Sequence, residues 1–239
     1  MNVESTKVDV ITGISSMAMR HVLTELADAY EQRSQQPASV VSVGGVDAAR
    51  RVADGEAFDF VVLAAAAIEK LAAGGRVDPA SRIDLARSGV AVAVPAGVSR
   101  PNIASEAAIR DAVLRARSIG YSTGPSGTHL TRLFERWGIA DVIASRIVQV
   151  PPGVPVATLA ASGDVELCFQ QLSELMGLPG IDVVGPLPPE IQLVTVFSAA
   201  VCTASRRGAA VHSAIAFLAS EEGDAMKLRY GMEPARGTA

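Results

Sequence analysis

The stretch GVAVAVPAG at residues 89–97 predicts an apolar strand that ends in a turn. Residues 90–94 carry no polar side chain, which is typical of a strand buried on both faces of a sheet. A second long apolar run covers residues 192–202. We expect both strands to cross between two lobes and to form a hinge, because the cleft between two lobes is a preferred place for a ligand.

These two strands divide the chain. We expect residues 1–85 to join residues 200–239 in one lobe, and residues 86–199 to form the other. On both sides of the hinge, short β-branched runs alternate with longer helical patterns, as in parallel sheets with crossover helices. The first strand is expected at residues 8–11. The sequence thus predicts an α/β protein of two Rossmann-like lobes, with mainly parallel sheets, a two-strand hinge and a ligand cleft between the lobes.

Composition limits the partners. The formal net charge is −4 and only 4% of residues are aromatic, with no cluster of Lys and Arg interleaved with aromatics, so we expect no nucleic-acid partner. The longest clean apolar stretch, residues 60–68, is too short to cross a bilayer, so no membrane insertion is expected. No leader-like pattern precedes the first strand, which favours the cytoplasm, or the periplasm if a signal peptide has been removed.

Cofactor and metal signals are absent from the sequence. The three histidines have no ligand spacing, and VGGVDAAR at residues 43–50 lacks the G-x-G-x-x-G pattern of dinucleotide sites. Cys168 and Cys202 lie in apolar strand-like runs, where two buried reduced thiols are the simplest interpretation, with a disulfide or a metal pair as the alternatives. We therefore expect no cofactor and no metal.

Four turns between strands and helices carry the functional signal. Their sequences are TGISS (12–16), VGGVD (43–47), STGPSG (122–127) and PPGVP (151–155). In an open parallel sheet such turns gather at the carboxyl edge of the strands, where unpaired N–H groups and helix dipoles favour an anion. Any one of them alone could be an ordinary helix cap. Two turns from each expected lobe together predict a shared site for a small anionic ligand.

Several stretches resemble the type-2 periplasmic-binding-protein superfamily, in the branch of molybdate-binding proteins of ABC transporters. They are TGISSMAM (12–19), ARRVADGEAFDFVVLA (49–64), VAVAVPAG (90–97), GDVELCFQQLSEL (163–175), GPLPPEIQ (185–192) and GMEPA (231–235). The resemblance covers essentially the whole chain, and it implies an ABC transporter as partner if the protein is exported. It also implies that the ligand is held at Ser15, at Gly44, Gly45 and Val46, at Ala64, at Ser126 and Gly127, and at Val154.

The donors differ from those of the molybdate binders. The Ser-rich second turn of that branch is Gly-Gly-Val here, its S-A-D segment is Leu63-Ala64-Ala65, and its ligand-contacting Tyr is Phe169. Amide and hydroxyl groups can take their place, together with Arg50. The candidates are Ser16, Ser122, Thr123, Thr128, and Gln170 or Gln171. Such a set suits an organic acid with several carboxylates better than a compact tetrahedral dianion.

The same branch contains aconitate isomerase, which moves a proton across an allylic tricarboxylate. A 1,3-proton shift needs a proton carrier in a closed cleft. His129 and Tyr121 are the candidates named by position, with His21 nearby, whereas alternation assigns Glu166 and Glu174 to solvent or structural roles. Three functions stay open: a solute-binding protein for a carboxylate, a cofactor-independent isomerase of a polycarboxylate, and a regulatory module with a vestigial cleft.

Overall fold

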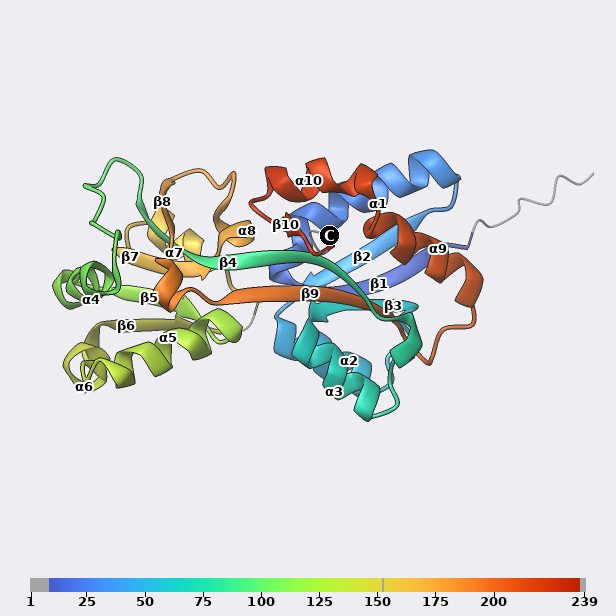
Figure 1. The fold of residues 1–239 in the computed structure, drawn as a ribbon, viewed down its shortest axis with the longest axis horizontal. Coiled ribbons are helices and arrows are strands. Elements are labelled where there is room, and N and C mark those ends of the chain that lie inside the picture. The colour runs from blue at the N-terminus through green and yellow to red at the C-terminus, as the bar shows by residue number, and fades with distance from the viewer. Residues whose placement is uncertain (1–8, 152, 237–239) are drawn as a thin grey trace, which may run out of the picture.

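The computed structural model describes residues 9–236 except residue 152, and in it the chain forms two lobes connected by long strands (Figure 1). The strands are β1 Ile11–Ser16, β2 Ala38–Val43, β3 Phe60–Ala64, β4 Ile83–Pro95, β5 Ile119–Ser122, β6 Ile147–Val150, β7 Leu167–Gln171, β8 Ile181–Pro186, β9 Val194–Val201 and β10 Glu233–Pro234. The α-helices are α1 Arg20–Ser34, α2 Gly45–Ala53, α3 Ala65–Ala73, α4 Glu106–Arg115, α5 Pro125–Arg136, α6 Ala140–Ile143, α7 Val156–Ala161, α8 Leu172–Leu175, α9 Gly208–Leu218 and α10 Asp224–Arg229. Short 3-10 turns are η1 Met17–Met19, η2 Pro79–Ser81, η3 Ala144–Arg146, η4 Pro189–Ile191 and η5 Glu221–Gly223.

The predicted fold class is confirmed, with one refinement in strand direction. In the first lobe β2, β1 and β3 are parallel, and in the second β7, β5 and β6 are parallel. Each connecting strand is antiparallel to its neighbours: β9 to β3 in the first lobe, β4 to β7 in the second, and β4 and β9 to each other. β4 and β9 are antiparallel to each other because β4 carries the chain from the first lobe to the second and β9 carries it back.

Strand β4 belongs to both lobes (Figure 1). Its first half, up to Gly89, pairs with β9, and its second half, from Val90, pairs with β7 and β8. The Gln192 amide clamps this crossing point, because its oxygen accepts from the Val90 N–H at 2.8 Å and its nitrogen donates to the Val90 carbonyl at 3.1 Å. On this pairing we propose that the lobes divide at residues 89/90 and 193/194, inside the limits of 86 and 199 expected from hydropathy.

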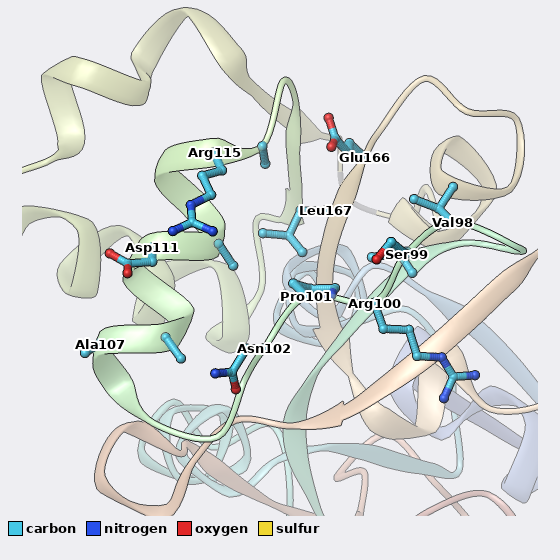
Figure 2. A pocket seen from close by; sticks show the side chains of 14 residues that line it. Val98, Ser99, Arg100, Pro101, Asn102, Ala107, Asp111, Arg115, Glu166 and Leu167 are labelled. Carbon is cyan, nitrogen blue, oxygen red and sulfur yellow. The ribbon is translucent and has the colours of Figure 1, made fainter.

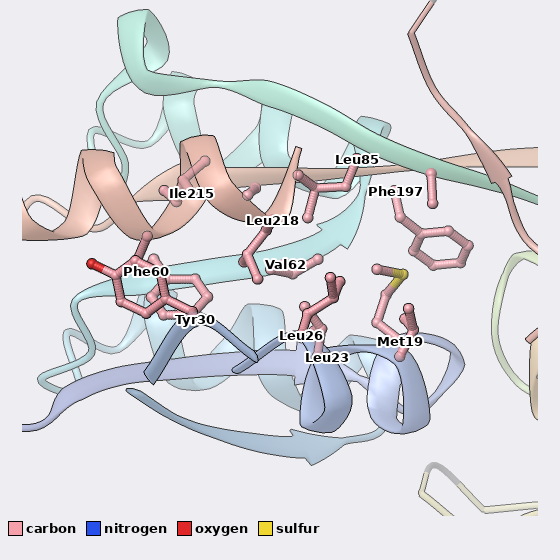
Figure 3. Close-up of a cluster of buried hydrophobic side chains, with 14 of the residues drawn as sticks. Met19, Leu23, Leu26, Tyr30, Phe60, Val62, Leu85, Phe197, Ile215 and Leu218 are labelled. Atoms are coloured by element: carbon pink, nitrogen blue, oxygen red, sulfur yellow. The ribbon is translucent and has the colours of Figure 1, made fainter. Parts of the chain in front are cut away.

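Two buried layers cover the sheet of the first lobe. The layer under α1 and α9 contains Met19, Leu23, Leu26, Phe60 and Phe197 (Figure 3). A second layer lies under α2 and α3 on the opposite face. Burying each large apolar side chain of this kind contributes roughly 2 kcal/mol, so both faces of the sheet are firmly held. The rigid sheet fixes the positions of the strand ends that line the cleft.

The first strand lies later in the chain than predicted. The expectation was residues 8–11, of which residue 8 is outside the described part, whereas β1 covers Ile11–Ser16. The small and hydroxyl residues of this segment predicted a turn, but its contacts with β2 and β3 hold it as a strand. Gly13 lies so close to the Phe60 ring that a Cβ on it would be 2.4 Å away. The Ser15 hydroxyl hydrogen-bonds to the Ser42 hydroxyl on β2 at 2.7 Å. Tertiary contacts thus override the low strand propensity of TGISS.

Asp59 joins three segments at the start of the first-lobe sheet. Its carboxylate accepts from the Thr12 N–H at 2.9 Å, from the Thr12 hydroxyl at 3.1 Å and from the Ser205 hydroxyl at 2.7 Å. We expect Asp59→Ala to lower the free energy of unfolding by about 3 kcal/mol, because buried donors lose a charged acceptor. Urea unfolding measures this change. Asp28→Ala, at an exposed site on α1, is the control and should shift stability by less than about 0.5 kcal/mol.

Candidate functional site

A cavity of about 570 Å³ lies between the lobes, where the strand ends of both sheets face each other. Its walls come from the turns after β1, β2 and β3 in the first lobe and from those after β5, β6 and β7 in the second. Of the residues predicted for the site, these line it: Ser16, Gly44, Gly45, Val46, Arg50, Ala64, Ser122, Thr123, Ser126, Val154, Gln170 and Gln171. The predicted turns therefore do come together, because the carboxyl ends of neighbouring parallel strands share one edge.

Ser16, rather than Ser15, presents a hydroxyl to the cavity. The Ser16 Oγ is buried and has no hydrogen-bond partner among the described residues. A buried hydroxyl without a partner costs free energy, which a ligand oxygen would recover. Ser15 lies one residue earlier on the strand and therefore on the other face, where its hydroxyl is used by Ser42. Ser16 is thus the hydroxyl of this segment that is free to bind.

Two helices of the first lobe begin at the cavity wall. Gly44 and Ala64 are the N-caps of α2 and α3, and neither helix has a side-chain cap. The N–H groups of both first turns, with the positive ends of both helix dipoles, therefore remain for a ligand anion. Further along the same helices, Arg50 and Lys70 line the cavity with their cationic side chains. Lys70 did not stand out in the sequence, since it lies two turns beyond the recognisable turn residues.

The second lobe adds hydroxyl donors at the start of α5. Ser122, Thr123 and the buried Ser126 line the cavity there. Gly127 does not line it, but a Cβ at this position would lie 1.6 Å from the Ser122 carbonyl oxygen. Glycine is therefore required for α5 to pack against the end of β5. Thr128 also lies outside the wall and is exposed.

The two lobes approach each other at one edge of the cavity. Gly153 has φ of +83°, and a Cβ on it would lie 3.5 Å from the Gly44 backbone nitrogen across the cleft. Val154, next in the chain, is one of the lining residues. A larger residue at position 153 would be strained in this left-handed conformation and would meet the opposite lobe. The close approach leaves the cavity partly enclosed.

The end of β7 supplies a buried amide and a carboxyl. Gln170 Nε2 donates to Glu174 Oε2 at 2.6 Å, and Gln170 Oε1 accepts from the Ala157 N–H at 3.4 Å. Burial raises the pKa of Glu174 from 4.5 to about 7, although the hydrogen bond from Gln170 opposes this shift. Sequence alternation assigned Glu174 to solvent or to a structural role, but it lines the cavity. The available signal was its spacing of four residues from Gln170 at the end of a strand.

Gln171 connects the cavity wall to the hinge. With its amide oxygen accepting from the Thr195 hydroxyl at 2.9 Å, its nitrogen lies 3.0 Å from the Ser88 carbonyl oxygen. Both partners belong to the strands that connect the lobes. A change in the angle between these strands would therefore move the Gln171 side chain in the cavity wall.

The histidine and tyrosine candidates lie elsewhere. Tyr121 is buried in the second lobe, where its ring packs against Phe134 at a centroid distance of 6.0 Å. His129 Nε2 lies 2.7 Å from the Ile191 carbonyl oxygen, and His21 stacks on Tyr230 at 5.9 Å. None of the three lines the inter-lobe cavity. Glu166 also lies away from it and pairs with Arg117 at 2.9 Å.

A second cavity, of about 540 Å³, lies within the second lobe (Figure 2). Its walls carry Arg100, Asp111, Arg115 and Glu166. Two acidic and two basic side chains give it no net preference for an anion, and Arg100 already pairs with Asp182 at 3.5 Å. The functional turns do not reach it. The inter-lobe cavity is thus the better candidate site.

Residues 9–236, apart from 152, contain neither a metal-type cluster nor a membrane-spanning helix. Within them no three His, Cys, Asp or Glu side chains gather in a way that could hold a metal ion. No helix of this part is long and apolar enough to cross a membrane. Cys168 and Cys202 are buried free thiols, and burial raises the pKa of each to about 12.

Two lobes on a pair of connecting strands, with helix N-termini facing a shared cavity, define a two-lobed solute-binding protein. The chain belongs to the bacterial extracellular solute-binding protein family, whose pattern matches residues 11–233. The fold of the periplasmic molybdate-binding protein of Azotobacter vinelandii is similar, with a TM-score of 0.80 and 18% identity over 95% of this chain and 100% of that one. The sulfate-binding protein of Mycobacterium tuberculosis has a TM-score of 0.76 and 16% identity over 95% and 87% of the two chains.

A relative of known activity is closer in sequence. Aconitate isomerase of a Pseudomonas species is 34% identical over 221 residues, which cover 90% of this chain and 84% of the relative. The predicted resemblance to the molybdate-binding branch that includes this enzyme is therefore confirmed.

Proposed function

We propose that the inter-lobe cavity binds a small organic polycarboxylate of the aconitate type and that the protein isomerises it. The observation that carries this is the spread of donors around a cavity of about 570 Å³: Ser16 and two helix N-termini on one side, Ser122, Thr123 and Ser126 on the other. A ligand with several separated carboxylates can use both sides at once. The 34% identity to an aconitate isomerase supports the same ligand class.

Two cations strengthen the case for several carboxylates. Arg50 and Lys70 lie on different helices, α2 and α3, and both line the cavity. Arg50 also contacts Asp47 at 3.4 Å and Asp54 at 3.7 Å, but it is largely exposed, so these pairs hold it only weakly. Each cation can meet a separate carboxylate while the backbone N–H groups hold a third.

A ligand screen tests this function. Thermal unfolding in the presence of cis-aconitate, trans-aconitate, citrate, molybdate or sulfate reports which of these anions binds the folded state. We expect either aconitate to raise Tm by several degrees and the inorganic anions to have little effect. Proton NMR then follows the conversion of one aconitate into the other. Stabilisation by molybdate or sulfate alone would overturn the polycarboxylate proposal.

Ser126→Leu is expected to weaken aconitate binding about 100-fold, because a branched apolar side chain would fill the donor wall at the start of α5 and leave a carboxylate without its partners. Isothermal titration measures the effect. Ser99→Leu is the matched control, since Ser99 lines the second cavity and is exposed. If Ser99→Leu loses affinity and Ser126→Leu does not, the ligand binds in the second cavity, and the proposed inter-lobe site is wrong.

A second candidate function is delivery of the same ligand to an ABC transporter. The family membership favours it, and a fold neighbour is the substrate-binding domain of a putative molybdenum ABC transporter from Clostridium difficile, with a TM-score of 0.72 and 14% identity over 95% of this chain and 99% of that one. This function predicts tight binding without turnover. Aconitate that binds but is recovered unchanged after long incubation would favour transport over isomerisation.

A further inference from the structure

The chemistry around the inter-lobe cavity is dominated by groups that bind rather than react. Its described lining consists of backbone, hydroxyl, amide and apolar groups, the cations Arg50 and Lys70, and one carboxyl, that of Glu174. A guanidinium stays protonated in proteins, so Arg50 cannot exchange a proton with a ligand. Glu174 is thus the acidic side chain of this wall that can accept a proton and return it.

We propose, on the basis of the proposed isomerase function, that Glu174 is the catalytic residue that carries the proton between the two allylic carbons of the substrate. Its carboxylate takes a proton from the carbon next to a substrate carboxylate, so a C–H bond breaks and an O–H bond forms. The electron pair left behind spreads over the allylic unit and its carboxylate as a dienolate. The Glu174 carboxyl then returns the proton to the other allylic carbon, the double bond moves by one position, and the enzyme is restored.

The surroundings of Glu174 suit a reversible proton carrier. Its pKa of about 7 is close to neutrality, so both its ionised form, which accepts a proton, and its protonated form, which returns one, are populated there. The added charge of the dienolate can be met by the first-turn N–H groups of α2 and α3, by the Ser16 hydroxyl and by the two cations. These groups lie on the first lobe and Glu174 on the second. Closure of the lobes would therefore bring base and charge-stabilising groups to the substrate together.

Gln170 is a positioning residue for Glu174. It is only 1% exposed, and its amide is fixed between the Ala157 N–H and Glu174 Oε2. Because Gln170 Nε2 donates its hydrogen bond to Oε2 of Glu174, the Oε1 atom of this carboxyl remains to accept the proton. The bond also stabilises the ionised form of Glu174. Loss of this amide should therefore raise the pKa of Glu174 further.

Few other charges act on Glu174. The Cys168 thiol lies nearby on β7, and burial keeps it protonated with a pKa of about 12. The charged side chains of β4, which packs against α8, are engaged elsewhere: Asp84 accepts from Ser198 at 2.5 Å, and Arg87 donates to the Ala235 carbonyl at 3.2 Å. The first-lobe turn η1 and helix α7 carry no titratable side chain. Across the cavity, Arg50 and Lys70 are the charged groups that face it.

The decisive variant is Glu174→Gln, assayed in the full chain with cis- and trans-aconitate. We expect kcat to fall about 1,000-fold, a typical effect of losing a general base, while KM and the aconitate-induced rise in Tm change little. Glu135→Gln, an exposed site on α5 with the same change of charge, is the control and should retain full activity. Retention of more than a tenth of kcat in Glu174→Gln would overturn the assignment.

The pH profile provides a test that does not depend on how that variant folds. Wild-type kcat/KM should rise with pH and level off above about 7, because the base must be ionised. Gln170→Leu should lower kcat and move this midpoint to higher pH. A wild-type profile that is flat from pH 5 to 9 would overturn the role of Glu174. If the wild type converts neither aconitate, the isomerase proposal itself fails, which is a distinct result.

Discussion

Gly127→Ala is expected to destabilise the protein by about 3 kcal/mol or more and to abolish ligand binding. A Cβ at this position would lie 1.6 Å from the Ser122 carbonyl oxygen and 2.8 Å from the carbon of the same group. Both are backbone atoms at the end of β5 and cannot move aside alone, so α5 must shift away from the strand. That shift would displace Ser122, Thr123 and Ser126 from the cavity wall.

Whether the substitution raises or lowers stability distinguishes a packing clash from the effect of helix propensity. In an open helical position, replacing glycine by alanine stabilises a helix by up to about 1 kcal/mol. Gly208→Ala, at the first residue of α9, is the matched control, since nothing lies within 4 Å of the added methyl group. Urea unfolding and aconitate titration of both variants give the answer. Equal stability of the two variants would contradict the proposed contact between α5 and β5.

The sequence predicted the site best where strand topology alone decides it. Three of the four turns flagged as anion-binding loops lie at strand ends as expected, and their N–H and hydroxyl groups gather in one cavity. The exception is informative. TGISS is strand rather than turn, so the face of each residue follows the pleat: Ser15 points toward β2 and Ser16 toward the cavity. Only the strand bounds could have separated these adjacent serines.

Glu174 was assigned to the wrong environment for a related reason. If the strand pattern of VELCFQQLSE continued, residues 170 and 174 would share one face but lie about 13 Å apart, too far for a hydrogen bond. The strand instead ends at Gln171, and helix α8 begins at Leu172. The helical turn shortens the rise per residue, so Glu174 comes within reach of Gln170 and the two side chains hydrogen-bond at 2.6 Å. A change of period within a few residues cannot be read from hydropathy alone.

The candidates chosen for their chemistry were the hardest to place. Tyr121 and His129 lie close in sequence to the α5 turn, yet each points into its own lobe, toward Phe134 and the Ile191 carbonyl. Proximity along the chain gives no direction for a side chain. The direction depends on the packing of α5 against β5, which long-range contacts determine.

A further large effect concerns stability and pH. Glu174→Gln is expected to be more stable than the wild type at about pH 8, by up to about 3 kcal/mol in the free energy of unfolding. In the unfolded chain this carboxyl titrates near its ordinary value of 4.5, whereas in the folded protein burial raises its pKa to about 7. Between these values the folded state binds more protons. Wild-type stability therefore falls as pH rises from about 4.5 to 7, and the variant escapes that loss.

Urea unfolding of both proteins at about pH 4.5 and pH 8 measures the difference, with Glu135→Gln as the exposed control. The two proteins should have nearly equal stability at the lower pH, and a gap as large at pH 4.5 as at pH 8 would show that packing, not ionisation, sets it. A stabilising substitution at the residue that the reaction needs is the expected mark of a functional carboxyl. The free protein carries the unfavourable buried charge at neutral pH because a proton carrier in this cavity must be able to ionise.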